Sequence, residues 1–302
     1  MDPRGASPRA RRASRGGRPT RRAVRLLEDD RRIGRDGTLR LGFERRGAAT
    51  VLRRVGYTLP LQVLAPVALE DPAAVVSVLN PTGGLLGGDR LTIEADLGPG
   101  AHALLTTPSA TRVYRAPAEA TVQTVALRLG RGAAVEWVPD HTIPFPGSVF
   151  RQTIECELED AATLVLLDAF AAGRVARDEA WAFGRLESAL TVRDRRGLVF
   201  HDRFVLRPGA HAAGLGGSEG HPYFATLVVA ADAGVERFVA AAGDALAGAR
   251  GATAGVAALP RRGAVVRCLA ASAPALTGAL EALWAVARRE LLGLPALSLR
   301  KP

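Results

Sequence analysis

Carboxylates at the ends of apolar segments are the side chains best placed to bind a ligand, and they are Asp89, Asp140, Asp168 and Glu179. Isolated carboxylate oxygens bind a divalent transition-metal ion weakly and exchange it quickly, which suits an ion in transit better than a stored one. Carboxylates at such positions more often cap turns or pair with arginine, and nearby partners are Arg90, Arg174 and Arg177. The residue types alone therefore favour a structural role and leave the transit of an ion open.

Histidine and cysteine, the ligands of tight metal sites, are not grouped. HxH or HExxH spacing is absent among the five histidines, which are His102, His141, His201, His211 and His221. Cys156 and Cys268 are far apart, without a CxxC motif, and are predicted to be buried thiols in a reducing compartment. No apolar run reaches the ~18 residues of a membrane span, and acidic residues follow Arg21-Arg22 where a leader would be apolar. These features predict a cytoplasmic protein without a tightly bound cofactor.

Two glycine-rich segments need to be compared with nucleotide-binding and catalytic motifs. Residues 80–90 have neither GxxxxGK[ST] nor GxGxxG spacing, and an alternating strand follows them rather than a helix. Their glycines are therefore expected to form turns. Gly216–Gly220 matches GxSxG around Ser218, but it lacks the strand and helix that hold a nucleophile. The sequence thus predicts no enzyme, and a hydrolase using Ser218 is kept only as a competing hypothesis.

The positive charge is concentrated at the N-terminus. The chain has a net charge of +10, and residues 1–25 contain nine arginines against the single acid Asp2. A Pro/Gly/Ser/Arg segment of this kind cannot bury enough apolar surface to fold alone. We therefore expect a basic disordered tail over residues 1–38 and one domain over residues 39–302. An alternative function follows from this tail, the binding of nucleic acid or an acidic partner, but the near-neutral body argues against it.

Strand-like patterns dominate the rest of the chain. Alternating apolar and polar residues predict strands at 91–97, 125–129 and 154–158, and apolar runs predict strands at 163–167, 198–206, 224–230 and 264–270. Segments 96–107, 128–139 and 157–168 resemble one another, each with an amphipathic strand, a tight turn and a second strand. Units that recur in this way are expected to stack, because none can bury its own apolar face.

Helical periodicity appears only in the C-terminal half. Apolar residues from Val235 to Leu246 form one stripe that ends at Gly248, and those from Leu276 to Leu291 form another that ends at Gly293. Ser272 and Pro274 are suited to the start of the second helix. The expected fold is therefore mainly β, an extended body of stacked strand-turn-strand units with a few helices in the C-terminal half.

Several motifs occur in the order found in one known family. They read Gly-Gly-Leu-Leu-Gly-Gly-Asp at 83–89, Leu-Thr-Thr-Pro-Ser-Ala-Thr-Arg-Val-Tyr-Arg at 105–115, and Trp-Val-Pro-Asp-His-Thr-Ile-Pro-Phe at 137–145. Gly173-Arg174, Glu179 with Trp181, and the segment 283–293 follow. Over residues 39–294 the chain resembles the urease accessory protein D family, also called H. It departs from the family pattern at Pro108, at Arg112 and in its last residues.

The resemblance implies a role without catalysis. It implies a β-rich scaffold that binds urease apoprotein and the accessory proteins F and G, and it allows a dimer within the accessory complex. It also implies an internal passage that guides Ni²⁺ to urease, with Ni²⁺ bound only transiently. Carried onto this chain, the candidate passage residues are Asp89, Asp140, His141, Asp168 and Glu179. The residues expected to support them are Arg112, Tyr114 and Arg174.

Overall fold

The computed structural model describes residues 35–64, 71–116, 118–208, 214, 217–248 and 250–299. The chain divides after Arg32, and every described residue belongs to the unit Ile33–Pro302. The predicted tail lies outside the described residues up to position 34. The first strand begins at Asp36, so residues 36–38 belong to the folded unit and not to the tail. Pairing explains the earlier start, because the Thr38 amide donates to Thr58 Oγ1 at 2.9 Å.

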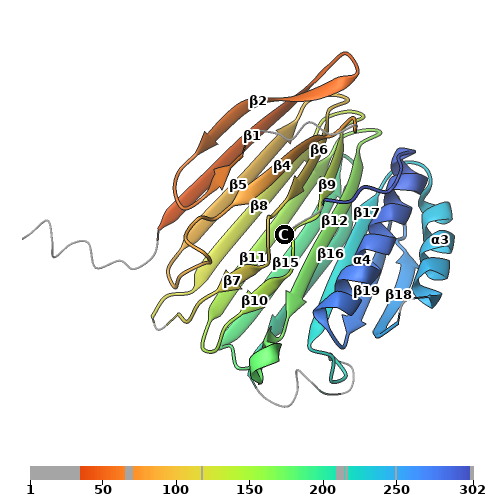
Figure 1. Ribbon diagram of the computed structural model, residues 1–302. Helices are drawn as coiled ribbons and strands as arrows, with labels where there is room; N and C mark the ends of the chain where they lie inside the picture. Colours follow the sequence, from red (N-terminus) through yellow and green to blue (C-terminus); the bar gives the residue numbers. More distant parts are fainter. Residues whose placement is uncertain are drawn as a thin grey trace, which may run out of the picture. The chain divides into compact units, whose positions relative to one another are not determined.

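Two large sheets make up most of this unit (Figure 1). Among the described residues the first sheet has seven strands, in the spatial order β16 (Gly197–Leu206), β15 (Arg185–Asp194), β11 (Val149–Leu158), β8 (Thr121–Leu129), β5 (Arg90–Leu97), β1 (Asp36–Arg46) and β2 (Ala49–Tyr57). The main path of the second is β18 (Ala252–Ala258), β19 (Gly263–Ala270), β17 (Tyr223–Ala230), β12 (Thr163–Ala171), β9 (Ala134–Trp137), β6 (His102–Thr106), β4 (Ala74–Leu79) and β3 (Gln62–Val63).

Short strands complete the second sheet at one end. β10 (Thr142–Pro144) pairs with β12 and with β7 (Thr111–Val113). A separate hairpin consists of β13 (Gly173–Arg174) and β14 (Glu179–Ala180), with the single-turn 3₁₀ helix η1 (Val175–Arg177) between them. These short elements and the loops around them carry most of the motifs noted in the sequence.

The predicted strand-turn-strand units are confirmed. β5 leads to β6, β8 to β9, and β11 to β12, so each unit contributes one strand to each sheet. Successive units pair in parallel in both sheets, and their turns also bond, since the Gly132 amide donates to Asp160 O at 2.9 Å. The predicted mainly β fold of stacked units is therefore correct, and it resembles a β-solenoid over this region.

The alternating pattern of the strands builds the core between the two sheets. Along β5 the buried residues are Leu91, Ile93, Ala95 and Leu97, while the residues between them are partly exposed. Side chains of this type from both sheets form one apolar cluster. Burial of each large apolar side chain contributes roughly 1.5–3 kcal/mol. The inner faces are thus apolar except at a few positions, which the next subsection describes.

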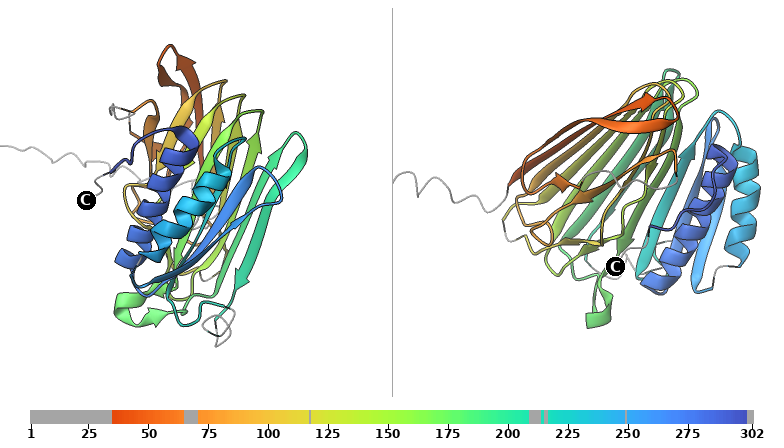
Figure 2. Two further views of the ribbon diagram at one scale, coloured as in Figure 1. Left: turned by 90° about the vertical axis from the view of Figure 1, so that its right-hand side faces the viewer. Right: turned by 45° about the horizontal axis from the view of Figure 1, so that its top comes forward.

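In the described part of the chain, the helices that cover a large sheet lie on the outer face of the second sheet. α3 (Val235–Ala247) and α4 (Ala273–Ala287) lie against β17, β18 and β19, and neither covers the first sheet (Figure 2). Both helices were predicted from periodicity. Ser272 was expected at the start of the second helix, and its Oγ accepts from the Ala275 amide at 3.3 Å. α4 continues as the π-helix η2 (Arg288–Leu292). Among the described residues, no helix has the length and apolarity needed to cross a membrane.

A buried ion cluster joins α4 and η2 to the second sheet. Arg288 and Glu136 both have 0 % exposed side chains, and Arg288 Nη1 lies 2.7 Å from Glu136 Oε1. Trp284 Nε1 donates to Glu136 Oε2 at 2.6 Å, and His102 Nε2 is 2.9 Å from Oε1. Every charge in the cluster has a partner, as buried charges require.

The same arginine also fixes the chain after η2. Arg288 pairs with Asp71 and donates from Nε to Pro295 O at 2.8 Å. The C-terminal segment, residues 294–299, is thereby held beside α4. This segment borders one of the cavities discussed below.

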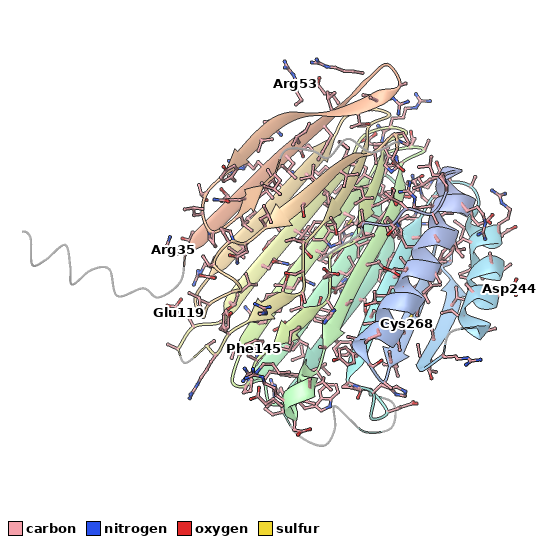
Figure 3. All side chains as sticks on the ribbon, viewed as in Figure 1. Arg35, Arg53, Glu119, Phe145, Asp244 and Cys268 are labelled. Carbon is pink, nitrogen blue, oxygen red and sulfur yellow. The ribbon has the colours of Figure 1, made fainter. Side chains whose placement is uncertain are left out.

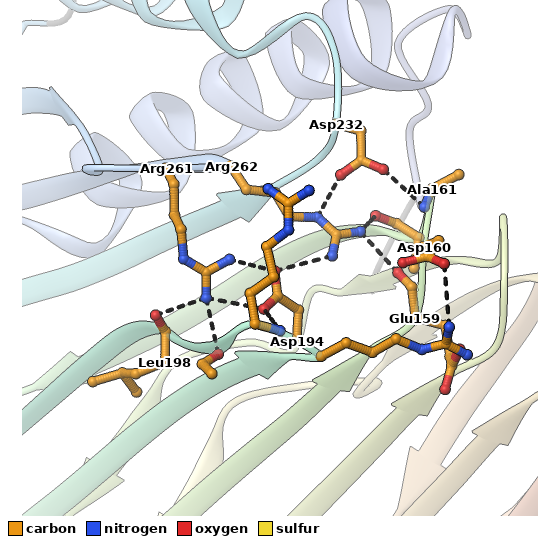
Figure 4. A network of polar contacts seen from close by, with 12 residues as sticks. Glu159, Asp160, Ala161, Asp194, Leu198, Asp232, Arg261 and Arg262 are labelled. Atoms are coloured by element: carbon orange, nitrogen blue, oxygen red, sulfur yellow. Dashed lines mark hydrogen bonds and ion pairs between the residues drawn. The ribbon is translucent and has the colours of Figure 1, made fainter.

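A second polar network joins turns from both sheets (Figure 4). Arg261, in the turn between β18 and β19, donates to Asp194 Oδ1 at 2.9 Å and to Leu198 O at 2.9 Å in the first sheet. Its neighbour Arg262 donates to Glu159 O at 2.9 Å, in the turn between β11 and β12. This network links the two sheets beside the turn between β11 and β12.

Candidate functional site

The side chain of Asp168 extends from the second sheet into the space between the two sheets. It lies on the inner face of β12 in the second sheet, and its carboxylate accepts hydrogen bonds from two residues of the first sheet. Gln152 Nε2 donates to Oδ1 at 2.9 Å, and Ser188 Oγ donates to Oδ2 at 3.0 Å. Gln123 Nε2 in turn donates to Gln152 Oε1 at 3.0 Å. We call Gln123, Gln152, Ser188 and Asp168 the inter-sheet polar cluster.

Opposing effects set the charge state of Asp168. Burial raises the pKa of its carboxyl to about 6, while the hydrogen bonds from Gln152 and Ser188 lower the pKa and the nearby charge of Asp202 raises it. The carboxyl is therefore mainly ionised at neutral pH, although it lies between two apolar faces. An ionised carboxylate in this position can bind a cation that enters the space.

Two cavities border this cluster, and a third lies on the helix side of the second sheet. The inter-sheet cavity, of about 140 Å³, is bordered by Gln152, Asp140 and Asp168, and the helix-side cavity, of about 580 Å³, lies between the second sheet, α4 and the C-terminal segment. The aromatic cavity, of about 330 Å³, is bordered by Phe170, Trp181, Phe204 and Phe224. Asp140 borders both the inter-sheet and helix-side cavities, and Asp168 both the inter-sheet and aromatic cavities. One carboxylate thus borders both members of each of these two pairs of cavities.

Asp140 and His141 follow β9, where the chain leaves the second sheet. The Asp140 amide donates to Thr107 Oγ1 at 2.9 Å, which fixes the turn against the loop after β6. His141 borders the helix-side cavity, and its ring lies edge-on to Tyr223 with 6.0 Å between centroids. Both sequence-predicted residues therefore border the cavity on the helix side.

Asp89 is used by the backbone. Its side chain is buried, and its two oxygens accept from the Arg35 amide at 2.9 Å and the Leu86 amide at 2.8 Å. These bonds hold the start of β5 beside the start of β1. Asp89 thus has the turn-capping role that the sequence left open, and it does not border the three cavities.

The glycine-rich turn packs against Tyr114. Tyr114 Oη donates to Gly83 O at 3.3 Å, and a Cβ atom on Gly84 would lie 2.6 Å from Tyr114 Cε2 and 2.7 Å from Arg112 O. Gly83 has a φ of +79°, a conformation that favours glycine. The turn therefore requires its glycines for conformation and space, as predicted. Arg112 and Gly84 both border the inter-sheet cavity.

Glu179 is paired with Arg174 across the β13–β14 hairpin. Arg174 donates to both carboxylate oxygens, with 2.7 Å between Nη2 and Oε1. The guanidinium also lies 4.5 Å from the ring centre of Phe145, which contacts Tyr114 edge-on at 5.1 Å between centroids. Figure 3 labels Phe145 among the side chains. The predicted supporting residues Tyr114 and Arg174 thus form one row of contacts, in which Phe145 lies between them and Glu179 stands at the end. This row does not reach Asp168.

The two cysteines are buried, as predicted. Cys268 borders the aromatic cavity, and burial raises the pKa of its thiol to about 11. Burial also raises the pKa of Cys156. Both remain thiols at neutral pH, and a thiol is a poor metal ligand. Within the described part of the chain, no group of three or more His, Cys, Asp or Glu side chains could hold a metal ion.

The partners of Asp168 were not predicted from the sequence. Gln152 and Ser188 occupy inward positions in strands whose other inward residues are apolar, such as Ile154 and Leu190. A polar residue at an inward strand position could have indicated a buried hydrogen bond. Its partner could not be identified, because the pairing depends on how the two sheets face each other.

Comparison with known proteins places these features in a family. A family model described as UreD urease accessory protein matches residues 35–302. Urease accessory protein UreD of Deinococcus radiodurans is 38% identical over 271 residues, covering 88% of this chain and 95% of the relative. UreD 2 of Streptomyces griseus is 37% identical over 275 residues, covering 88% and 94%. UreD of Alkalilimnicola ehrlichii is 33% identical over 261 residues, covering 86% and 88%.

Proposed function

This chain belongs to the UreD urease accessory protein family, and we propose that it is a non-catalytic maturation factor that guides Ni²⁺ to the urease metal centre. The names of its relatives support a role in urease maturation. The positions of Asp140 and Asp168, each on the border of two cavities, support the guidance of an ion.

The observation that carries this function is the position of these two carboxylates. An ion moving from the helix-side cavity to the inter-sheet cavity passes Asp140, and one moving on to the aromatic cavity passes Asp168. His141 borders the first of these cavities and provides a third ligand on the helix side. The proposed passage therefore uses Asp140, His141 and Asp168. Asp89 and Glu179 instead support the loops and the hairpin around it.

The ligand chemistry of this route suits transfer. Single carboxylates hold Ni²⁺ less tightly than sites with several imidazole or thiolate ligands. The described residues contain no such multi-ligand group, so the ion would not be retained. A shielded interior also keeps the ion from stronger competing ligands on its way.

The partners we propose are urease apoprotein and the accessory proteins F and G, in the cytoplasm, with a dimer possible in the accessory complex. Exposed apolar side chains support a role in binding proteins. Tyr57, Leu59 and Leu64 are 49%, 50% and 58% exposed, and they lie close together in the sequence, from the last residue of β2 to the residue after β3. Exposed apolar side chains that gather in one patch mark contacts with partners.

Activation of urease apoprotein in a purified system tests this function. The mixture contains apoprotein, accessory proteins F and G, Ni²⁺ at limiting concentration and a chelator, with or without this chain. We expect the chain to raise both the nickel content of urease and its activity. Equal nickel content with and without the chain, under conditions in which the complex forms, would rule out a role in delivery.

A further inference from the structure

We infer that Gln152 and Ser188 are positioning residues for Ni²⁺ transfer, which hold the Asp168 carboxylate in the space between the sheets so that the ion meets it in one orientation. The inference rests on the function proposed above. It concerns residues that neither the family motifs nor the sequence patterns identified.

The positions of these residues support the inference first. Gln123, Gln152 and Ser188 are directly opposite one another on the neighbouring strands β8, β11 and β15. Gln152 and Ser188 are only 4% and 3% exposed. A buried polar group is costly unless it forms hydrogen bonds. Within the cluster both residues donate to Asp168, and Gln152 Nε2 also donates to Ser188 Oγ at 3.3 Å.

The direction of the hydrogen bonds in the inter-sheet polar cluster explains how the cluster holds the Asp168 carboxylate. An ionised carboxylate only accepts, so the side-chain amide of Gln152 must present its NH₂ group to Asp168. Gln123 enforces this orientation, because it donates to the carbonyl oxygen of Gln152 at 3.0 Å. Ser188 fixes the second oxygen of Asp168 at 3.0 Å. Each carboxylate oxygen keeps further lone-pair capacity for an ion.

A positively charged side chain near Asp168 indicates why the hydrogen bonds from Gln152 and Ser188 matter. Asp168 lies opposite Thr226 on β17, and Thr226 lies opposite Arg267 on β19. Arg267 pairs with Asp202 of the first sheet at 2.9 Å and donates to Thr226 Oγ1 at 3.3 Å. It is a positive charge in the same row as Asp168. A carboxylate released by Gln152 and Ser188 could turn toward this guanidinium, and it would then be unavailable to Ni²⁺.

A double-mutant cycle on the nickel transfer rate tests the inference. The full chain is assembled with its accessory proteins and apo-urease, and transfer of Ni²⁺ is followed for Ser188→Ala, Asp168→Asn and the double variant. We expect Ser188→Ala to slow transfer about tenfold or more, as the loss of a residue supporting a metal ligand commonly does. In the Asp168→Asn background, Ser188→Ala should cause no further loss, because Ser188 acts through Asp168.

Two further variants separate positioning from folding. Ser188→Thr keeps the hydroxyl and should recover most of the rate lost in Ser188→Ala. Gln152→Leu keeps a similar side-chain volume and removes the other hydrogen bond to Asp168. If Ser188→Ala folds poorly, this variant takes its place in the double-mutant cycle. The exposed Asp244→Asn on α3 is the unaffected control.

The outcomes distinguish the two levels of the proposal. Equal losses from Ser188→Ala with and without the Asp168 carboxylate would show a general structural effect and overturn the positioning role alone. Normal transfer in the single variant Asp168→Asn would remove this residue from the passage, and would overturn both that part of the proposed function and the inference that rests on it.

Discussion

Gly84 shows at the residue scale how one position shapes the border of the inter-sheet cavity. The Tyr114 ring and the Arg112 carbonyl occupy the space that a side chain would need. The same tyrosine contacts Phe145, which packs against Arg174. A change at this glycine would therefore be transmitted to the row that ends at Glu179.

We expect Gly84→Ala to destabilise the protein by about 1–3 kcal/mol, because the new methyl group would meet backbone and ring atoms that cannot move far. Urea unfolding measures the change. Gly56→Ala is the matched control, since a Cβ atom added at this position in β2 would have no atom within 4 Å. That variant should change stability by less than about 1 kcal/mol. Similar unfolding midpoints for both variants would contradict the packing described for Gly84.

Residue roles were only partly predictable from the sequence. Pairing of Glu179 with Arg174 could be anticipated, because the two residues are close in the chain and opposite in charge. The capping of backbone amides by Asp89 was likewise among the alternatives. The bonds of Asp168 with Gln152 and Ser188 depend on how two sheets face each other, and no local pattern encodes that distance.

At the element scale, a single side chain, that of Arg288, anchors the α4–η2 segment. Arg288 lies in the buried ion cluster and holds Asp71, Glu136 and the backbone of Pro295. The helix was predicted from its apolar stripe, and its cap from Ser272. Its change to a π-helix at Arg288 was not, because the apolar stripe continues at helical spacing to Leu291.

Replacement of Arg288 should show how much stability is lost when buried carboxylates have no positively charged partner. We expect Arg288→Met to destabilise the protein by about 3–5 kcal/mol, since two buried carboxylates lose their cation. The neighbouring Arg289→Met is the control, because Arg289 is 59% exposed and its ion pair should contribute no more than about 1 kcal/mol. Urea unfolding compares the two, and hydrogen exchange should rise over residues 294–299 only in Arg288→Met. Equal stability of the two variants would contradict the cluster's role.

Strand prediction succeeded where alternation is strong and failed where it is weak. β5 was located almost completely, but the predicted segments 125–129 and 154–158 cover only the second halves of β8 and β11. The first halves carry the inward polar residues Gln123 and Gln152, which interrupt the apolar alternation. β2 lies at the edge of its sheet with most of its residues exposed, so its sequence lacks the pattern. Its existence follows from pairing with β1.

At the scale of the whole molecule, turns from both sheets are joined through Asp194. Arg261 donates to this carboxylate and holds its pKa at about 2, below the ordinary value of 3.8. A folded-state pKa below the unfolded one stabilises the protein above the unfolded value, and the contribution disappears as the pH falls from about 4 to about 2. The network should therefore weaken in acid.

We expect Arg261→Ala to lower stability at neutral pH, and the difference from the unmodified protein to shrink as the pH falls through this range. Urea unfolding measured from about pH 7 down to about pH 2 gives the difference across the titration of Asp194. The exposed pair of Arg54 and Asp96 provides the control, and Arg54→Ala should have a smaller effect. A difference for Arg261→Ala that stays constant down to the acid limit would contradict the coupling to Asp194.

The most direct test of the proposed passage is the nickel content of urease matured with the double variant Asp140→Asn/Asp168→Asn. Both substitutions keep the side-chain shape and remove the charge at the two positions that each border two cavities. We expect the accessory complex to form normally and urease to receive at least about tenfold less nickel than with Asp244→Asn, as loss of metal-binding groups commonly causes. Full nickel loading by a normally assembled complex of the double variant would show that the ion does not pass these carboxylates.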